Sequence, residues 1–258
     1  MRNPYFLISL LTALMWGALF NTPARAQPFN ILMQMMETQQ AIVEVHAINT
    51  DVFEPSQAVA GINPETGRLV IINRRPVAQY ERGGSGVIIH PSGIIVTNAH
   101  TVYRANRVQV NLDDGQTFPA KIIKFVNAMD LALLKIDTPE LLPFVDIANS
   151  DSIRLGQDVI TIGNSPLLKE TVSGGKIIGL GIERTVQPSG IRRTGLIQTT
   201  VNLYQGDSGG PLFNDQGDLI GLMTADEGSR DHSSFAIPSN RIYQYLLEYL
   251  HAQGEKSN

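Results

Sequence analysis

The sequence contains no cysteine, which excludes a thiol nucleophile, a disulfide framework, a thiolate zinc site and a lipid anchor on cysteine. It also lacks an excess of positive charge, since 20 Lys and Arg stand against 24 Asp and Glu. That balance argues against nucleic acid as a partner. Hydrophobic residues make up 43% of the 258 residues, so the chain can bury a core in one large all-β unit or two small domains.

Long apolar runs are missing except at the amino terminus. Residues 6–20 carry no charge, but the run is too short for a comfortable membrane span. Arg2 precedes it, and Ala24-Arg25-Ala26 after it is the small-x-small pattern that signal peptidase cuts. We predict a signal peptide over 1–26, cleavage after Ala26 and a periplasmic or secreted bacterial protein without a stable membrane anchor. The alternative is an uncleaved amino-terminal anchor.

Short β-rich segments separated by turn residues fill most of the remaining chain. Such spacing predicts an all-β sandwich or barrel. The expected strands are 41–47, 86–90, 93–97, 107–112, 118–126, 131–136, 158–163, 176–182, 196–200, 211–213, 219–224 and 233–237.

Other segments predict helices, a loop and a boundary. Apolar residues from Ile242 to Leu250 repeat at helical spacing between a capping Ser239 or Asn240 and Gly254, which predicts a carboxy-terminal helix. A second helix is expected over 27–40. Residues 49–84 are rich in polar residues, Pro and Gly, and predict a long loop with one short strand at 69–72. The weakly patterned stretch after Asp137 divides the chain into 27–150 and 151–258, which we expect to form one peptidase unit with two halves.

Residues 206–211, Gly-Asp-Ser-Gly-Gly-Pro, are the most informative stretch. A serine hydroxyl becomes a nucleophile when a base takes its proton, and donors must face the oxyanion that forms. Glycines on both sides of Ser208 permit a tight turn, in which the amides of Gly206 and Ser208 point to one spot. The alternative is a glycine-rich turn with an incidental serine.

Five histidines are candidates for the base: His46, His90, His100, His232 and His251. His251 falls at the end of the predicted helix, where a cation suits the helix dipole. His100 follows a strand, a turn and a second strand, and small residues flank it. A third group must orient the imidazole. Asp130 precedes the apolar run 131–136, but spacing alone does not choose it over the other aspartates.

Three motifs together resemble the trypsin/chymotrypsin-like serine proteases. They are residues 97–100 (TNAH), 130–133 (DLAL) and 206–211 (GDSGGP), in the order His, Asp, Ser. Within that class the chain most resembles the bacterial HtrA (Deg) branch. Residues 84–89 (GSGVII), 162–164 (IGN), 172–175 (VSGG) and 235–240 (FAIPSN) are similar to that branch. The resemblance covers about residues 41–250.

The resemblance implies a double six-stranded β-barrel with a carboxy-terminal helix, the first barrel carrying His100 and Asp130 and the second Ser208. It implies a serine endopeptidase that acts on polypeptides and serves protein quality control in the envelope. Ser208 would be the nucleophile, His100 the base and Asp130 the orienting acid. The amides of Gly206 and Ser208 would form the oxyanion hole. No metal or organic cofactor is expected, and a trimer is expected by analogy.

The resemblance also implies a pocket for the residue before the cut. Asn202 and Leu203 are expected at its floor, Thr224 and Asp226 on one wall, and Ser234 opposite them. An apolar floor favours a small or medium aliphatic side chain, while Asp226 would favour a basic one; we weigh Leu203 above Asp226 because a carboxylate at the pocket mouth keeps its water.

Two features depart from the HtrA pattern. Asp207 stands where that branch usually has Asn, and the chain ends at Asn258 without the usual PDZ domain, so PDZ-based capture is not expected. In trypsins this acid pairs with a freshly cut amino terminus; Gln27 does not resemble that activation site, so Asp207 needs another partner or solvent.

Two alternative functions stay open. The first is a catalytically silent binding module on the same scaffold. The second is an esterase, although the alternation of strands and helices typical of α/β-hydrolases is missing.

Overall fold

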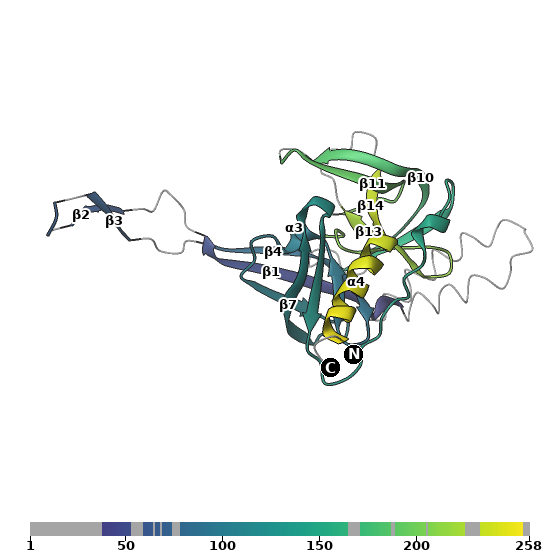
Figure 1. The fold of residues 1–258 in the computed structure, drawn as a ribbon, viewed down its shortest axis with the longest axis horizontal. Helices are drawn as coiled ribbons and strands as arrows, with labels where there is room; N and C mark the ends of the chain where they lie inside the picture. Colours follow the sequence, from purple (N-terminus) through teal and green to yellow (C-terminus); the bar gives the residue numbers. More distant parts are fainter. Residues whose placement is uncertain are drawn as a thin grey trace, which may run out of the picture.

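The computed structural model describes residues 38–52, 59–63, 65–67, 69–73, 78–164, 171–186, 189–204, 206–224 and 233–254 (Figure 1). The predicted signal peptide and most of the helix predicted over 27–40 lie outside them. None of the helices in the described ranges has the length and apolar character needed to span a membrane.

The first half of the fold is a closed antiparallel barrel with strand order β1-β4-β5-β8-β7-β6. In this barrel β5 and β8 are buried almost throughout, because their apolar side chains pack into the larger apolar core. The strands are β1 (Ile42–Val52), β4 (Ala78–His90), β5 (Ile94–Thr97), β6 (Arg107–Asn111), β7 (Thr117–Val126) and β8 (Leu131–Ile136).

The second half is another closed antiparallel barrel, with strand order β10-β11-β14-β13-β12-β9. β10 and β11 form its longest hairpin (Figure 1). The two barrels confirm the predicted double six-stranded fold. The strands are β9 (Asp158–Gly163), β10 (Thr171–Val186), β11 (Ile191–Thr199), β12 (Pro211–Phe213), β13 (Leu219–Thr224) and β14 (Ser234–Pro238).

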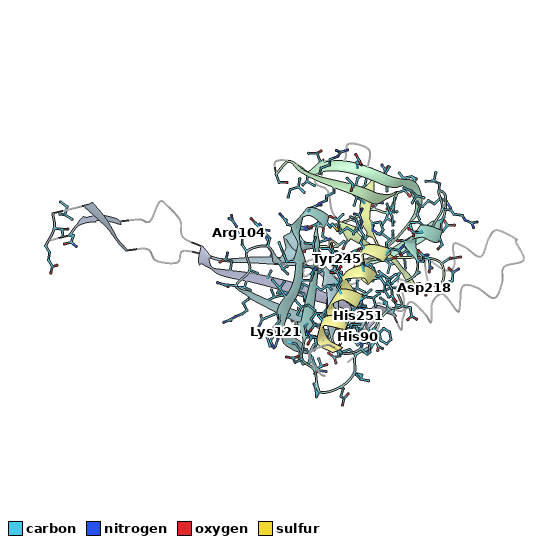
Figure 2. The ribbon with its side chains drawn as sticks, viewed as in Figure 1. His90, Arg104, Lys121, Asp218, Tyr245 and His251 are labelled. Carbon is cyan, nitrogen blue, oxygen red and sulfur yellow. The ribbon has the colours of Figure 1, made fainter. Side chains whose placement is uncertain are left out.

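The carboxy-terminal helix α4 (Ser239–Gly254) confirms the predicted helix and ties the end of the chain to the first barrel. Ile242 and Leu246 are buried in the larger apolar core, which contains residues of both barrels. The Tyr245 hydroxyl donates to Met129 Sδ at 3.4 Å, and Lys124 Nζ lies 4.7 Å from the centre of the Tyr245 ring. Figure 2 shows Tyr245 on the helix. The smaller core lies in the second barrel.

Short helical turns complete the fold. They are α3 (Ala99–Val102), η2 (Asn127–Met129) and η3 (Ser150–Ser152). The sequence places His100 at the end of a strand, but in the structure it belongs to α3.

The long loop predicted over 49–84 is wrong in part. β1 continues to Val52 and β4 begins at Ala78, because these residues pair across the two strands, as Ile48 does with Glu81. β2 (Val59–Ile62) and β3 (Leu69–Asn73) form a separate two-stranded sheet that joins neither barrel. Cross-strand pairing overrides the weak β-propensity of this polar stretch.

Candidate active site

Asp130 is held in a backbone conformation that turns both its carbonyl and its carboxylate towards α3. Its φ of +57° lies in the left-handed region, which Asp tolerates better than most residues with a side chain. The Asp130 carbonyl oxygen accepts hydrogen bonds from the amide of Ala99 at 3.0 Å and from Asn98 Nδ2 at 3.1 Å. The turn before β8 therefore fixes the start of the helical turn that carries His100.

The carboxylate of Asp130 receives both donors of His100. His100 Nδ1 lies 2.8 Å from Oδ2, and the His100 backbone amide donates to Oδ1 at 2.9 Å. An ionised carboxylate only accepts hydrogen bonds, so a neutral His100 ring in this position carries its proton on Nδ1 and presents the lone pair of Nε2. The His100 side chain is 41% exposed, and it can meet a reactant while Asp130, 1% exposed, stays dry.

Two groups from the second barrel also contact Asp130 Oδ2. The Thr224 hydroxyl donates to it at 2.8 Å, and Arg193 Nη2 lies 3.2 Å away. Burial alone would raise the pKa of Asp130. The hydrogen bond from His100, followed by the charges of His100 and Arg193, outweighs burial and lowers the pKa below its usual value. The carboxylate is thus ionised at neutral pH.

Ser208 lies in a buried turn of the second barrel that docks on β4. Its carbonyl oxygen accepts a hydrogen bond from the Ser85 amide at 2.9 Å. Gly209 has φ of +85°, and a Cβ there would lie 2.1 Å from the Ser85 carbonyl oxygen, so only glycine fits this approach. A Cβ on Gly84 would lie within 3.2 Å of both the Ser208 carbonyl oxygen and the Thr101 side chain. The Ser208 backbone therefore lies beside the residue that follows His100.

Ser85 is a positioning group that the sequence did not reveal. Its hydroxyl donates to the Gly206 carbonyl at 2.9 Å and accepts from the Asn164 amide at 3.0 Å. Ser85 is fully buried. One serine of the first barrel therefore fixes the turn before Ser208, and the only sequence signal was its place in the GSG motif.

Asp207 has the partner that the sequence left open. Its carboxylate accepts a hydrogen bond from the Tyr204 backbone amide at 2.8 Å, and its side chain is fully buried. The acid therefore braces the nucleophile turn from within its own loop.

The residues predicted to line the substrate pocket differ in their exposure and in the partners that their side chains contact. Asn202 is exposed, and Leu203 is half-buried against the smaller core. The Thr224 hydroxyl is turned onto Asp130 rather than onto a pocket wall. The Ser234 hydroxyl bonds to Thr199 and to the Val201 carbonyl. Asp226 lies outside the described residues.

The other histidines in the described ranges lie elsewhere. His90 Nδ1 contacts the Ser92 hydroxyl at 2.8 Å in the turn after β4. His251 is in the last turn of α4, and Figure 2 shows both residues well away from α3. His46 pairs with Glu44 on β1. His232 lies outside the described residues.

Comparison with known proteins agrees with this fold. The family described as trypsin-like peptidase domain matches residues 84–222, more than half of the chain. The chain is 39% identical over 185 residues to the periplasmic pH-dependent serine endoprotease DegQ of Escherichia coli, a match that covers 68% of this chain and 39% of DegQ.

Two further relatives come from distant organisms. Serine protease HTRA1A of Danio rerio is 38% identical over 193 residues, covering 74% of this chain and 39% of that protein. A probable periplasmic serine endoprotease, DegP-like, of Rickettsia prowazekii is 41% identical over 179 residues, covering 67% and 34%. The chain thus spans between about a third and two fifths of the length of these relatives. Together with the fold and the His100–Asp130 contact, the family match shows that this chain belongs to the trypsin-like peptidase domains.

Proposed function

We propose that this chain is a serine endopeptidase that cuts protein substrates through an acyl-enzyme on Ser208. The observation that carries the proposal is the buried Asp130 carboxylate bonded to His100, with the Ser208 turn docked beside the same helical turn. A serine, an oriented imidazole and a dry carboxylate are the groups that acyl transfer needs.

The chemistry follows from the roles of these groups. Ser208 Oγ attacks the scissile carbonyl carbon while His100 Nε2 takes the hydroxyl proton, and the amides of Gly206 and Ser208 stabilise the oxyanion. The C–N bond then breaks, and His100 returns its proton to the leaving amine. Water attacks the ester with His100 again as base, which releases the carboxylic acid and restores Ser208. Asp130 stabilises the imidazolium that forms in each half of the cycle.

The pocket for the residue before the cut is proposed to be apolar. The Thr224 hydroxyl is bonded to Asp130, and the Ser234 hydroxyl is bonded to the Thr199 hydroxyl and the Val201 carbonyl, so neither is available to bind a polar substrate group. Leu203 supplies apolar surface. A preference for small and medium aliphatic residues is expected, broad because one methylene changes binding by about 1–3 kcal/mol. A peptide-library profile dominated by Arg or Lys would contradict it and point to Asp226.

The proposed setting is the bacterial periplasm, where a broad endopeptidase would serve protein quality control. Two observations support this setting. The DegQ and DegP-like relatives are named as periplasmic proteins, and residues 1–26 have the pattern of a signal peptide. Amino-terminal sequencing of the exported protein should begin at Gln27; recovery of the full-length chain from membranes would contradict it.

The test of the function is Ser208→Ala, with Ser92→Ala as a matched control in the β4–β5 turn. Both are assayed on unfolded casein and with a fluorophosphonate probe. We expect Ser208→Ala to lose about 10⁶-fold in rate and all labelling, while Ser92→Ala keeps both. Casein cleavage by Ser208→Ala at the wild-type rate would refute the role of Ser208, and absence of both signals in the wild type would favour a silent scaffold.

A further inference from the structure

Arg193 is a cation of the second barrel that faces the joint between the barrels. It occupies the third position of β11, and its side chain is 10% exposed. Its neighbour Arg192 points the other way, 68% exposed, and pairs with Glu183 at the surface. The alternation of a strand therefore separates two arginines, one solvated and one aimed at Asp130.

The guanidinium of Arg193, the Thr224 hydroxyl and the Asp130 carboxylate oxygen Oδ2 all contact one another. Its Nη2 lies 3.2 Å from Asp130 Oδ2, and its Nη1 donates to the Thr224 hydroxyl at 3.2 Å. That hydroxyl in turn donates to the same Oδ2 at 2.8 Å. This oxygen also receives His100 Nδ1, so Arg193 and the imidazole share one carboxylate without displacing each other.

Two other arginines lie near this group. Arg82 of β4 donates to the His100 carbonyl oxygen at 3.0 Å. Arg184 of β10 is the cross-strand partner of Arg193, and its guanidinium lies 4.4 Å from the centre of the Phe235 ring. Like charges opposite each other on a sheet are unfavourable, so the place of Arg193 needs a compensating partner, and Asp130 supplies it.

A purely structural role fits this arrangement poorly. Arg193 Nε is buried and has no hydrogen-bond partner among the residues described here, which is costly for a charged group. Apolar side chains of similar size often stabilise such positions as well or better. What an apolar side chain cannot supply is a fixed positive charge beside the Asp130 oxygen that His100 also contacts.

We propose that Arg193 is a positioning residue for the reaction. Its positive charge offsets part of the negative charge of Asp130, so that His100 stays neutral, and works as a base, at lower pH than it would beside Asp130 alone. The inference rests on the proposed serine endopeptidase function. Asp130 alone would attract a proton onto His100, whereas the pair of Asp130 and Arg193 is close to neutral and attracts it less. Burial raises the pKa of Asp130, and the hydrogen bond and charge of His100 and then the charge of Arg193 lower it below its usual value, which is consistent with this sharing.

The first experiment is the pH dependence of kcat/KM for Arg193→Gln, Arg193→Met and Arg193→Lys, with Arg192→Gln as the matched control. Gln and Met should move the acid limb to higher pH by about one unit, the size typical of losing a neighbouring charge. The plateau should fall less than about tenfold, because Thr224 and the His100 amide still orient Asp130. Arg193→Lys should keep the wild-type limb, as should Arg192→Gln.

The second experiment does not need activity. In the Ser208→Ala background, NMR follows the ring signals of His100, assigned with His100→Gln, as the pH changes. The titration midpoint of that ring should rise by about one unit on Arg193→Gln, and a change here would stand even if Ser208 proved not to be the nucleophile.

Three results would overturn the inference while leaving the peptidase assignment intact. One is an unmoved acid limb and unmoved titration in folded Arg193→Gln. Another is an equal shift in Arg192→Gln, which would make the effect one of net charge alone. The third is loss of folding in both the Gln and Met variants, which would make Arg193 a tie between the barrels.

Discussion

The two barrels contribute to the candidate site in opposite ways. His100 and Asp130 both belong to the first barrel, where the turn before β8 is hydrogen-bonded directly to α3 and the residue before it. The second barrel brings Ser208, Thr224 and Arg193 to that pair across the joint. The contact between His100 and Asp130 is therefore made within one barrel, whereas the place of the nucleophile depends on the docking of two.

In the described part of the chain, buried and partly buried hydrogen bonds link the two barrels beside Ser208. Ser85 holds the carbonyls of both Gly206 and Ser208, and its own hydroxyl is held by Asn164. The Thr97 hydroxyl, three residues before His100, donates to the Ser85 carbonyl at 2.8 Å. A substitution inside the first barrel should thus damage the base, and one at the joint should damage the alignment of the nucleophile.

The largest effect is expected inside the first barrel, from Asp130→Asn. The amide cannot stabilise the imidazolium and favours the wrong tautomer of His100, so kcat should fall roughly 10⁴-fold at neutral pH. KM should change little, because Asp130 is buried and does not face the substrate. Steady-state kinetics on a fluorogenic peptide measure this, and an unchanged kcat would move the orienting role to another acid.

Much of this comparison could be predicted from the sequence. The predicted ends of the strands at 131–136, 158–163, 211–213 and 219–224 are confirmed, because each is an apolar run between turn residues. The predicted strand at 176–182 is too short. β10 extends over polar and glycine residues that pair with β9 and β11, and such pairing cannot be seen along the chain.

The site divides in the same way. His100 and Asp130 were chosen by motif, and the structure brings them into contact. Arg193 carried no sequence signal, because its contact with Asp130 depends on which face of β11 meets the other barrel. Thr224 was assigned to a pocket wall, since the motif gives its position in the chain and not the direction of its hydroxyl.

A smaller effect is expected at the joint, from Ser85→Ala. The change leaves the Gly206 carbonyl without the Ser85 hydroxyl and loosens the turn before Ser208, so kcat should fall roughly 10-fold to 100-fold, in line with small misplacements of reacting groups. Ser189→Ala is the matched control. Its hydroxyl also bonds a backbone carbonyl, that of Val186, but in an exposed turn.

The two serine variants are compared by kcat and by the rate of fluorophosphonate labelling. Ser189→Ala should equal the wild type in both. If Ser85→Ala labels and turns over at the wild-type rate, the nucleophile turn does not depend on the first barrel for its position, and the distinction between the barrels drawn above fails.

The smallest expected effect concerns stability and compares the two carboxylates that flank β8. Asp130, before the start of the strand, is 1% exposed; Asp137, after its end, is 72% exposed. The pKa of each carboxyl is lowered. For Asp137 the main cause is the hydrogen bonds from Lys135 and Lys121. For Asp130, burial raises the pKa, and His100 and Arg193 outweigh it. A lowered pKa stabilises the fold above the unfolded value of about 3.9 and loses that contribution as pH falls through the folded value.

The measurement is urea unfolding in the Ser208→Ala background, which prevents self-digestion, at pH 7, 5, 4 and 3. At pH 7, Asp130→Asn should lower the free energy of unfolding by about 1–3 kcal/mol, as expected for a buried hydrogen-bonded group. Its deficit should shrink as the pH falls below about 4, because the unfolded wild-type chain then binds a proton at Asp130 that the native carboxylate, with its lowered pKa, still lacks. Asp137→Asn should stay close to its parent at every pH, since solvent screens its pairs with the two lysines. A deficit for Asp130→Asn that stays constant down to pH 3 would show that its ionised form adds nothing to the docking of the barrels, leaving the charge of Asp130 a role in the reaction alone.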